Sequence, residues 1–93
     1  MKIRFYIDPE TGRPHVENHG VSTSECAQVL ESPLQDFAGR DDSRVALGQT
    51  RGRGYLKVIY TRGDDGSLFV ITAYPLVGKP LAALKRRLRK KGR

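Results

Sequence analysis

The stretch RVALGQTRGRGYLKVIYTRGDDGSLFVITAY, from Arg44 to Tyr74, decides the fold of this 93-residue chain. Its three apolar runs are rich in Val, Ile, Phe and Tyr, which suit a half-buried strand. Two Gly-rich breaks, at 50–54 and 62–66, separate the runs, and breaks of about five residues are typical of hairpin connections. The stretch therefore predicts a three-stranded antiparallel meander, on which the other segments must pack.

Alternation along the three runs assigns each residue to one face of this sheet. If each break is a complete loop, Thr61 pairs with Ser67 and Gln49 pairs with Tyr55. One face, the better floor for a helix, then carries Val45, Leu47, Ile59, Phe69, Ile71 and Ala73, with Tyr55 and Lys57 toward one end. The other face carries Arg44, Ala46, Gly48, Leu56, Val58, Tyr60, Leu68, Val70, Thr72 and Tyr74. This register predicts that Arg44 lies beside Tyr60, with Thr72 and Tyr74 on the neighbouring strand.

The segments before the meander predict a strand, a turn and one short helix. Residues 2–7 alternate as a strand does, and residues 8–12 (DPETG) form a turn. Residues 15–17 either return as a second short strand, completing an N-terminal hairpin, or form an extended loop. Residues 34–43 are expected to be a loop anchored by Phe37.

The short helix has a clear start and a clear stop. Ser22 and Glu25 have the spacing of a capping box, and Pro33 ends the helix soon after Glu31. The expected apolar face carries Cys26, Val29 and Leu30. We expect this helix to lie on the sheet, and Cys26 to be a small buried hydrophobic residue, not a nucleophile.

The charge of the chain is concentrated at its end. Residues 79–93 hold eight of the 17 Lys and Arg residues and none of the 10 Asp and Glu residues. Pro80 suits a helix start, and Leu81, Leu84 and Leu88 form one apolar stripe. Together these segments predict an α+β fold: a small antiparallel sheet (the meander plus an N-terminal strand or hairpin), one short helix packed on it, and a basic C-terminal helix. We expect a single domain over residues 1–78 and a basic helical arm over residues 79–93.

Composition narrows the classes of function. A basic block usually meets a polyanion, although it can also be a solvated helix end that maintains solubility. One Cys and two His are too few for a structural zinc site, so we expect no metal and no cofactor. The apolar runs are too short for a membrane span and no signal-peptide core follows Met1, which predicts a cytoplasmic protein without membrane contact. The small core would gain stability from a partner or a dimer.

Several short motifs over residues 16–74 resemble the BrnT branch of the RelE/ParE toxin superfamily. They are His19-Gly20-Val21-Ser22, a helix ending at Glu31-x-Pro33, Arg44-x-x-x-Gly48-x-Thr50, Leu56-x-Val58-x-Tyr60-Thr61 and Val70-Ile71-Thr72-Ala73. The closing VITAY also resembles related uncharacterised bacterial proteins. The chain departs from the BrnT pattern at Tyr74, where an arginine is usual, and at Asn18, where a lysine is usual.

The resemblance implies a metal-independent endoribonuclease that acts on mRNA, free or on the ribosome, and that pairs with a small antitoxin protein. In such an enzyme a base activates the 2′-hydroxyl, cations stabilise the phosphorane and an acid protonates the leaving oxygen. The catalytic candidates are His19, Arg44, Tyr60 and Tyr74. His19 could instead be a loop residue bonded to the backbone, and the two tyrosines could be rim residues of the core.

The cations predict where RNA would bind. The candidates in the sheet and its loops are Arg51, Arg53, Lys57 and Arg62, and those in the C-terminal helix are Lys85, Arg86, Arg87, Arg89 and Lys90. Residues 50–54 could equally be an ordinary hairpin loop with solvated arginines. Two alternatives to a toxin-like enzyme or its degenerate relative remain: a non-catalytic RNA- or ribosome-binding module, and an antitoxin-type protein-interaction subunit.

Overall fold

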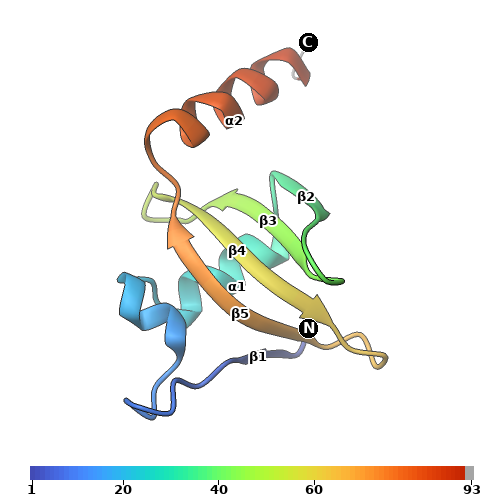
Figure 1. The fold of residues 1–93 in the computed structure, drawn as a ribbon. Helices are drawn as coiled ribbons and strands as arrows, with labels where there is room; N and C mark the ends of the chain where they lie inside the picture. Colours follow the sequence, from blue (N-terminus) through green and yellow to red (C-terminus); the bar gives the residue numbers. More distant parts are fainter. Residues whose placement is uncertain (92–93) are drawn as a thin grey trace.

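A single curved sheet organises the computed structural model, which describes residues 1–91 (Figure 1). Within these residues the sheet has five strands in the order β1-β5-β4-β3-β2. Their bounds are Ile3–Phe5 (β1), Gln35–Ala38 (β2), Arg44–Gln49 (β3), Tyr55–Arg62 (β4) and Leu68–Pro75 (β5). β1 runs parallel to β5, and the other neighbours are antiparallel. The predicted α+β class and the β3–β4–β5 meander are both confirmed.

The predicted register holds in one hairpin and fails in the other. Gln49 pairs with Tyr55 and Arg44 with Tyr60, as expected. Thr61, however, pairs with Phe69 and not with Ser67, because Arg62 and Leu68 close a longer ladder. This pairing differs from the predicted one by two residues, which leaves each residue of β5 on its predicted face. A β-bulge between Ile59 and Tyr60 then adds a shift of one residue.

The bulge exchanges the faces of the end of β5. Val58 pairs with Ala73, and both residues are fully buried in the core cluster that also contains Tyr60. Thr72 and Tyr74 pair with Ile59 and Lys57 on the opposite face. The prediction that Thr72 and Tyr74 share a face with Tyr60 is therefore wrong, since a bulge leaves no trace in simple alternation.

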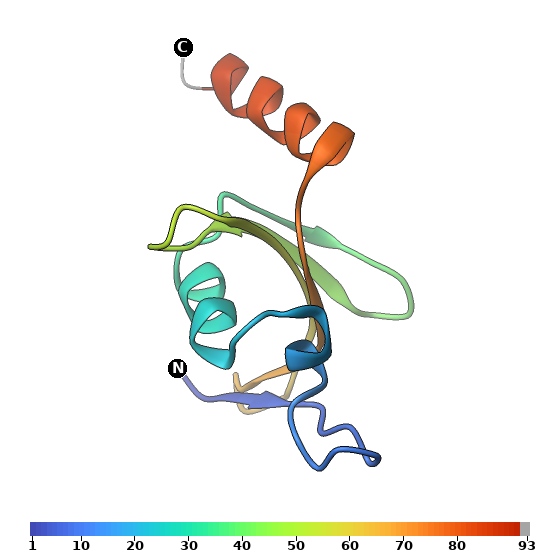
Figure 2. The ribbon, with the colours of Figure 1, turned by 90° about the vertical axis from the view of Figure 1, so that its left-hand side faces the viewer.

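The short helix α1 (Thr23–Glu31) lies against one face of the sheet (Figure 2). Its capping box is complete: Glu25 N donates to Ser22 Oγ (3.0 Å) and Ser22 N donates to a Glu25 carboxylate oxygen (2.9 Å). Val29 packs on Gly48 of β3, so the face that α1 covers is the one carrying Gly48 and Tyr60. The core on this face comprises Val16, Val21, Cys26, Val29, Leu30, Ala46, Leu56, Val58, Tyr60, Leu68, Val70 and Ala73.

The C-terminal helix α2 (Gly78–Lys91) covers part of the opposite face. Leu84 is fully buried in a cluster with Val45, Leu47 and Leu76, and Leu81 and Leu88 pack beside it. The face that carries Val45, Leu47 and Ile59 therefore packs against a helix, as predicted, but that helix is α2 and not α1. No helix within residues 1–91 is both long enough and apolar enough to cross a membrane.

Two segments take conformations other than those predicted for them. Residues 35–38 form β2, which extends the sheet beyond β3, and Phe37 is 45% exposed, so it does not anchor a loop. Residues 15–17 belong to a 3₁₀ helix, η1 (His15–His19), and not to a strand. The return after the N-terminal turn is limited to a single bridge between Ile7 and Pro14.

Candidate functional site

Four rings form a continuous row along one edge of the sheet. We call Tyr6, His15, His19 and Tyr74 the aromatic row. Ring centroids are 5.9 Å apart for Tyr6 and His15, 5.2 Å for His15 and His19, and 4.9 Å for His19 and Tyr74. The last two contacts are edge-to-face, a favourable arrangement for aromatic rings. The row brings together two groups predicted to be catalytic, His19 and Tyr74.

The row depends on how η1 is placed. Val16, 1% exposed, anchors η1 in the core, and His15 N donates to Tyr6 O (2.9 Å), continuing the line of β1. Gly20 ends η1 with φ 75°, a left-handed conformation that glycine adopts without steric cost. Both histidines therefore emerge beside β5, with the His19 ring against Tyr74 and the His15 ring against His19.

The Asp8 carboxylate lies beside His15, one of the two inner rings of the aromatic row. Asp8 Oδ2 lies 3.5 Å from His15 Nδ1 and accepts a 2.7 Å hydrogen bond from Asn18 Nδ2. Hydrogen bonds from the Glu10 backbone N–H and then from Asn18 lower the pKa of Asp8, so it is a carboxylate at neutral pH. Since His15 Nδ1 faces Asp8, its Nε2 is the nitrogen left for other contacts.

A cation adjoins the other end of the row. Lys57 pairs directly with Tyr74 across β4 and β5, so the two side chains lie on the same face. Lys57, Tyr74, His19 and His15 together offer one ammonium group, one phenol and two imidazoles at a partly exposed surface. This set can move protons and stabilise an anion.

The other two predicted catalytic residues form a separate cluster. Arg44 Nε donates to Asp36 Oδ1 (2.8 Å), and the hydroxyl of Tyr60, a residue only 1% exposed, donates to Asp36 Oδ2. The hydrogen bond to Asp36 raises the pKa of Arg44. Arg44 does lie beside Tyr60, as predicted, but both are engaged by Asp36, which sequence reasoning missed because it assigned β2 to a loop.

The four catalytic candidates thus fall into two groups at different edges of the sheet. Asp36 and Arg44 lie on β2 and β3, whereas Tyr74 lies on β5, next to η1. Arg62 and Arg44 both line a hollow of about 370 Å³ near the turn that joins β2 and β3. The structure does not bring the four residues into one pocket.

The remaining predicted cations occupy two surfaces. Arg51 and Arg53 are exposed in the β3–β4 loop, where Arg51 N donates to Gln28 Oε1 (2.7 Å). On α2, Lys85 lies 5.3 Å from the centre of the Tyr55 ring, and Arg87 Nε donates to Gln35 Oε1 (3.1 Å). Arg86, Arg89 and Lys90 are exposed on the same helix.

Sequence reasoning missed His15 and Asp8 as members of the site. A histidine at the end of a turn and an aspartate at its start were both present in the sequence, but η1 had no recognised signal. Within residues 1–91, no group of three or more His, Cys, Asp and Glu side chains is placed to hold a metal ion. Cys26 is fully buried, as predicted, and burial raises its pKa to about 12.

Comparisons of the chain with protein-family models, with curated proteins and with solved structures give no match. The resemblance to BrnT-like toxins therefore stays a prediction carried by the short motifs.

Proposed function

We propose that this protein binds RNA and cleaves it at the aromatic row without a metal, as a RelE/BrnT-like toxin or a degenerate relative of one. The observation that supports this proposal best is the contact of His19 with Tyr74, beside Lys57 and His15. An exposed acid–base set next to a cation suits transfer of a phosphoryl group between oxygen atoms of RNA.

In the proposed reaction His19 takes the proton from a ribose 2′-hydroxyl, and the resulting oxygen attacks the adjacent phosphorus. Lys57 stabilises the charge on the phosphorane oxygens, and a protonated His15, with its Nδ1–H toward Asp8, adds its Nε2–H as a second donor. The P–O5′ bond then breaks, and Tyr74 donates a proton to the leaving oxygen. The products are a 2′,3′-cyclic phosphate and a 5′-hydroxyl. Asp8 orients His15 and is not itself a proton donor in this scheme.

In this account Arg44 and Tyr60 stabilise the fold. Both are committed to Asp36, and the Tyr60 hydroxyl is buried. Arg44 and Tyr60 therefore contribute to stability and not to catalysis in the proposed reaction.

A second candidate function is non-catalytic binding to RNA or the ribosome. The exposed cations of α2 support it, because neutralising phosphates supplies sequence-independent affinity. This candidate shares RNA binding with the first and differs in predicting intact RNA.

A small antitoxin partner, or a second copy of the chain, belongs to the same proposal. β2 is an edge strand. Leu34, which directly precedes it, and Phe37, which lies within it, are 42% and 45% exposed. An exposed edge with apolar side chains is suited to strand addition by a partner. Action on mRNA would place the protein in the cytoplasm.

Product analysis tests the proposal. Single-stranded RNA is incubated with the protein either in EDTA without ribosomes or with ribosomes in a buffer that contains Mg²⁺, and the ends of any fragments are identified. We expect 2′,3′-cyclic phosphate and 5′-hydroxyl ends. Intact RNA in every sample, together with binding that weakens steeply with salt, would favour the second candidate instead.

A further inference from the structure

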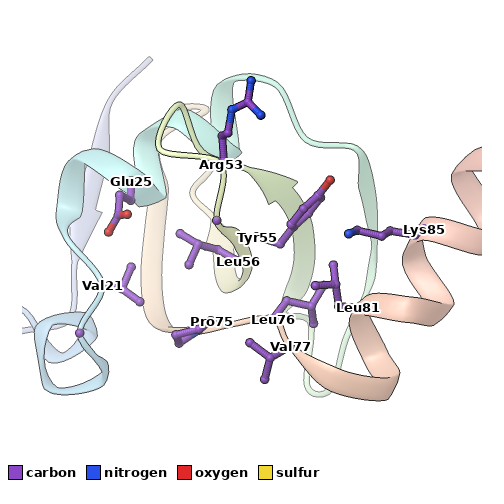
Figure 3. A pocket seen from close by; sticks show the side chains of 12 residues that line it. Val21, Glu25, Arg53, Tyr55, Leu56, Pro75, Leu76, Val77, Leu81 and Lys85 are labelled. Atoms are coloured by element: carbon purple, nitrogen blue, oxygen red, sulfur yellow. The ribbon is translucent and has the colours of Figure 1, made fainter.

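A groove of about 390 Å³ lies between the start of α1, the start of β4 and the first turns of α2 (Figure 3). We call it the interhelix groove. Its apolar wall consists of Val21, Leu56, Leu76, Val77 and Leu81. Val77 is 66% exposed, so this wall is open to solvent at the segment that joins β5 to α2. A pocket of this size falls in the range of small-ligand sites, about 300–1,000 Å³.

Charged groups stand around the apolar wall. Arg53 rises from the β3–β4 loop, and Lys85 extends from α2 toward Tyr55 on another side (Figure 3). Glu25 also lines the groove, and one of its oxygens accepts the Ser22 N–H of the capping box. The groove therefore combines an apolar floor with two cations and one carboxylate, which suits an anion that carries a flat apolar group.

The interhelix groove adjoins the ends of the two segments that carry His19 and Tyr74. Gly20 and Pro75 line the groove, and they directly follow His19 and Tyr74 in the chain. The backbone at one side of the groove is therefore joined directly to both members of the proposed acid–base pair, although neither ring lines the groove.

We propose that the interhelix groove holds one nucleotide of single-stranded RNA, with its base on the apolar wall and its phosphate toward Arg53 and Lys85. Its identity as an RNA subsite rests on the proposed function. Bases of single-stranded RNA bind largely by contact of their faces with apolar and aromatic side chains, and cations hold the backbone. The Glu25 carboxylate is placed to accept an exocyclic amino group, so adenine, guanine and cytosine should bind better than uracil.

Nucleotide titration monitored by NMR tests the groove without any cleavage. Methyl-labelled protein is titrated with AMP, with UMP and with inorganic phosphate. We expect AMP to shift the methyl signals of Val77, Leu81 and Leu56, UMP to bind more weakly, and phosphate alone to leave these methyl signals in place.

Two charge variants and a matched control locate the phosphate. Arg53 has φ 75°, a conformation that asparagine tolerates, so Arg53→Asn removes the cation without straining the loop. We expect Arg53→Asn and Lys85→Gln each to weaken AMP binding by about tenfold, the loss typical of one charge-assisted hydrogen bond. Lys90→Gln removes a cation of α2 outside the groove and should change the affinity less than about twofold.

Kinetics on RNA provide a second readout. Val77→Asp places a negative charge on the exposed apolar wall, and Ser32→Asp places the same charge at an exposed position outside the groove. We expect Val77→Asp to raise KM about tenfold with kcat nearly unchanged, because it weakens ground-state and transition-state binding alike. Ser32→Asp should leave both parameters close to those of the wild type.

The outcomes separate the two proposals. AMP shifts that are confined to α2 outside the groove, or phosphate shifts equal to those of AMP, would overturn the nucleotide subsite even if RNA is cleaved. AMP binding in the groove with intact RNA would overturn the cleavage proposal and leave the groove as part of an RNA-binding module.

Discussion

His19 and Tyr74 stand edge-to-face, with their ring centroids 4.9 Å apart and their planes at 63°. One residue ends a 3₁₀ helix near the N-terminus and the other lies near the end of the last strand. The two residues are distant in the sequence, so their contact depends on how η1 packs beside β5. This contact is the basis of the functional account, and it separates His19 and Tyr74 from Arg44 and Tyr60.

The Asp36 cluster should matter for stability and not for catalysis. Asp36→Ala leaves Arg44 and the buried Tyr60 hydroxyl without their partner, which should cost about 1–3 kcal/mol of unfolding free energy. Urea denaturation measures this loss, and Asp64→Ala, which removes an exposed carboxylate in a hairpin loop, is the control. RNA cleavage per folded molecule should be unchanged. A cleavage loss of 100-fold at wild-type stability would instead make this cluster catalytic.

The close approach of α1 to the sheet predicts the effect of a single methyl group. A Cβ added at Gly48 would lie 3.0 Å from Val29 Cγ1 and 3.4 Å from two further atoms of the same side chain. We expect Gly48→Ala to destabilise the protein by about 1–3 kcal/mol, the usual effect of overpacking a core.

Two further variants test whether the effect of Gly48→Ala comes from the helix–sheet contact. Gly52→Ala should be nearly neutral, because its added Cβ would have only Thr50 Oγ1, at 3.8 Å, within reach. Val29→Ala should reduce the additional cost of Gly48→Ala, since it removes the clashing methyl groups. An equal cost of Gly48→Ala in both backgrounds would show that packing against Val29 is not the cause.

The parts of the fold that could be predicted are those that local sequence signals mark. The capping box fixes where α1 begins, and the spacing of Cys26, Val29 and Leu30 identifies its buried face. The β3–β4 register followed because a five-residue Gly-rich loop joins two alternating strands. In each case the determining residues are close together in the chain.

Features that depend on distant partners could not be predicted in this way. The bulge at Ile59 and Tyr60 reverses Thr72 and Tyr74 without any local glycine or proline to mark it. β2 is a strand because β3 offers it an edge, although its sequence QDFA is not apolar. His19 and Tyr74 were suggested by their chemistry and by the resemblance, whereas His15 and Asp8 become part of the site only through the fold of the N-terminal turn.

The exposed cations of α2 should control the salt dependence of RNA binding. A triple substitution, Arg86→Gln, Arg89→Gln and Lys90→Gln, is preferable to deletion of α2 because Leu84 is fully buried. Each lost phosphate contact on a single strand should reduce the slope of log affinity against log salt by about 0.7, or about 2 for the three together. Filter binding from low to moderate salt measures this slope.

A control triple tests whether position or net charge is responsible. Lys2→Gln, Arg4→Gln and Arg40→Gln remove the same charge from exposed sites outside α2. Equal slopes for the two triple variants would show that RNA contacts are not concentrated on α2.

Burial of Cys26 predicts a stability effect at high pH. Burial raises the pKa of the folded thiol to about 12, whereas an unfolded thiol titrates near about 8.5. The neutral thiol therefore favours the folded state, and this contribution is present at neutral pH and is lost as the pH rises from about 9 toward 12. Cys26→Ala should remove that component, which the difference between the two unfolding curves over this pH range isolates. Parallel curves for the two proteins would contradict the assignment.

Single-turnover cleavage of a labelled single-stranded RNA in EDTA tests the central claim most directly. Four proteins are compared: the wild type, His19→Asn, Tyr74→Phe and Tyr6→Phe, the last altering a row member that has no role in proton transfer. We predict losses of about 100-fold or more for His19→Asn and Tyr74→Phe, typical of removing an acid or base, with RNA affinity and unfolding free energy near wild type and little change for Tyr6→Phe. Wild-type cleavage rates in both His19→Asn and Tyr74→Phe, or no cleavage by the wild type, would contradict the claim that this edge of the sheet is an active site.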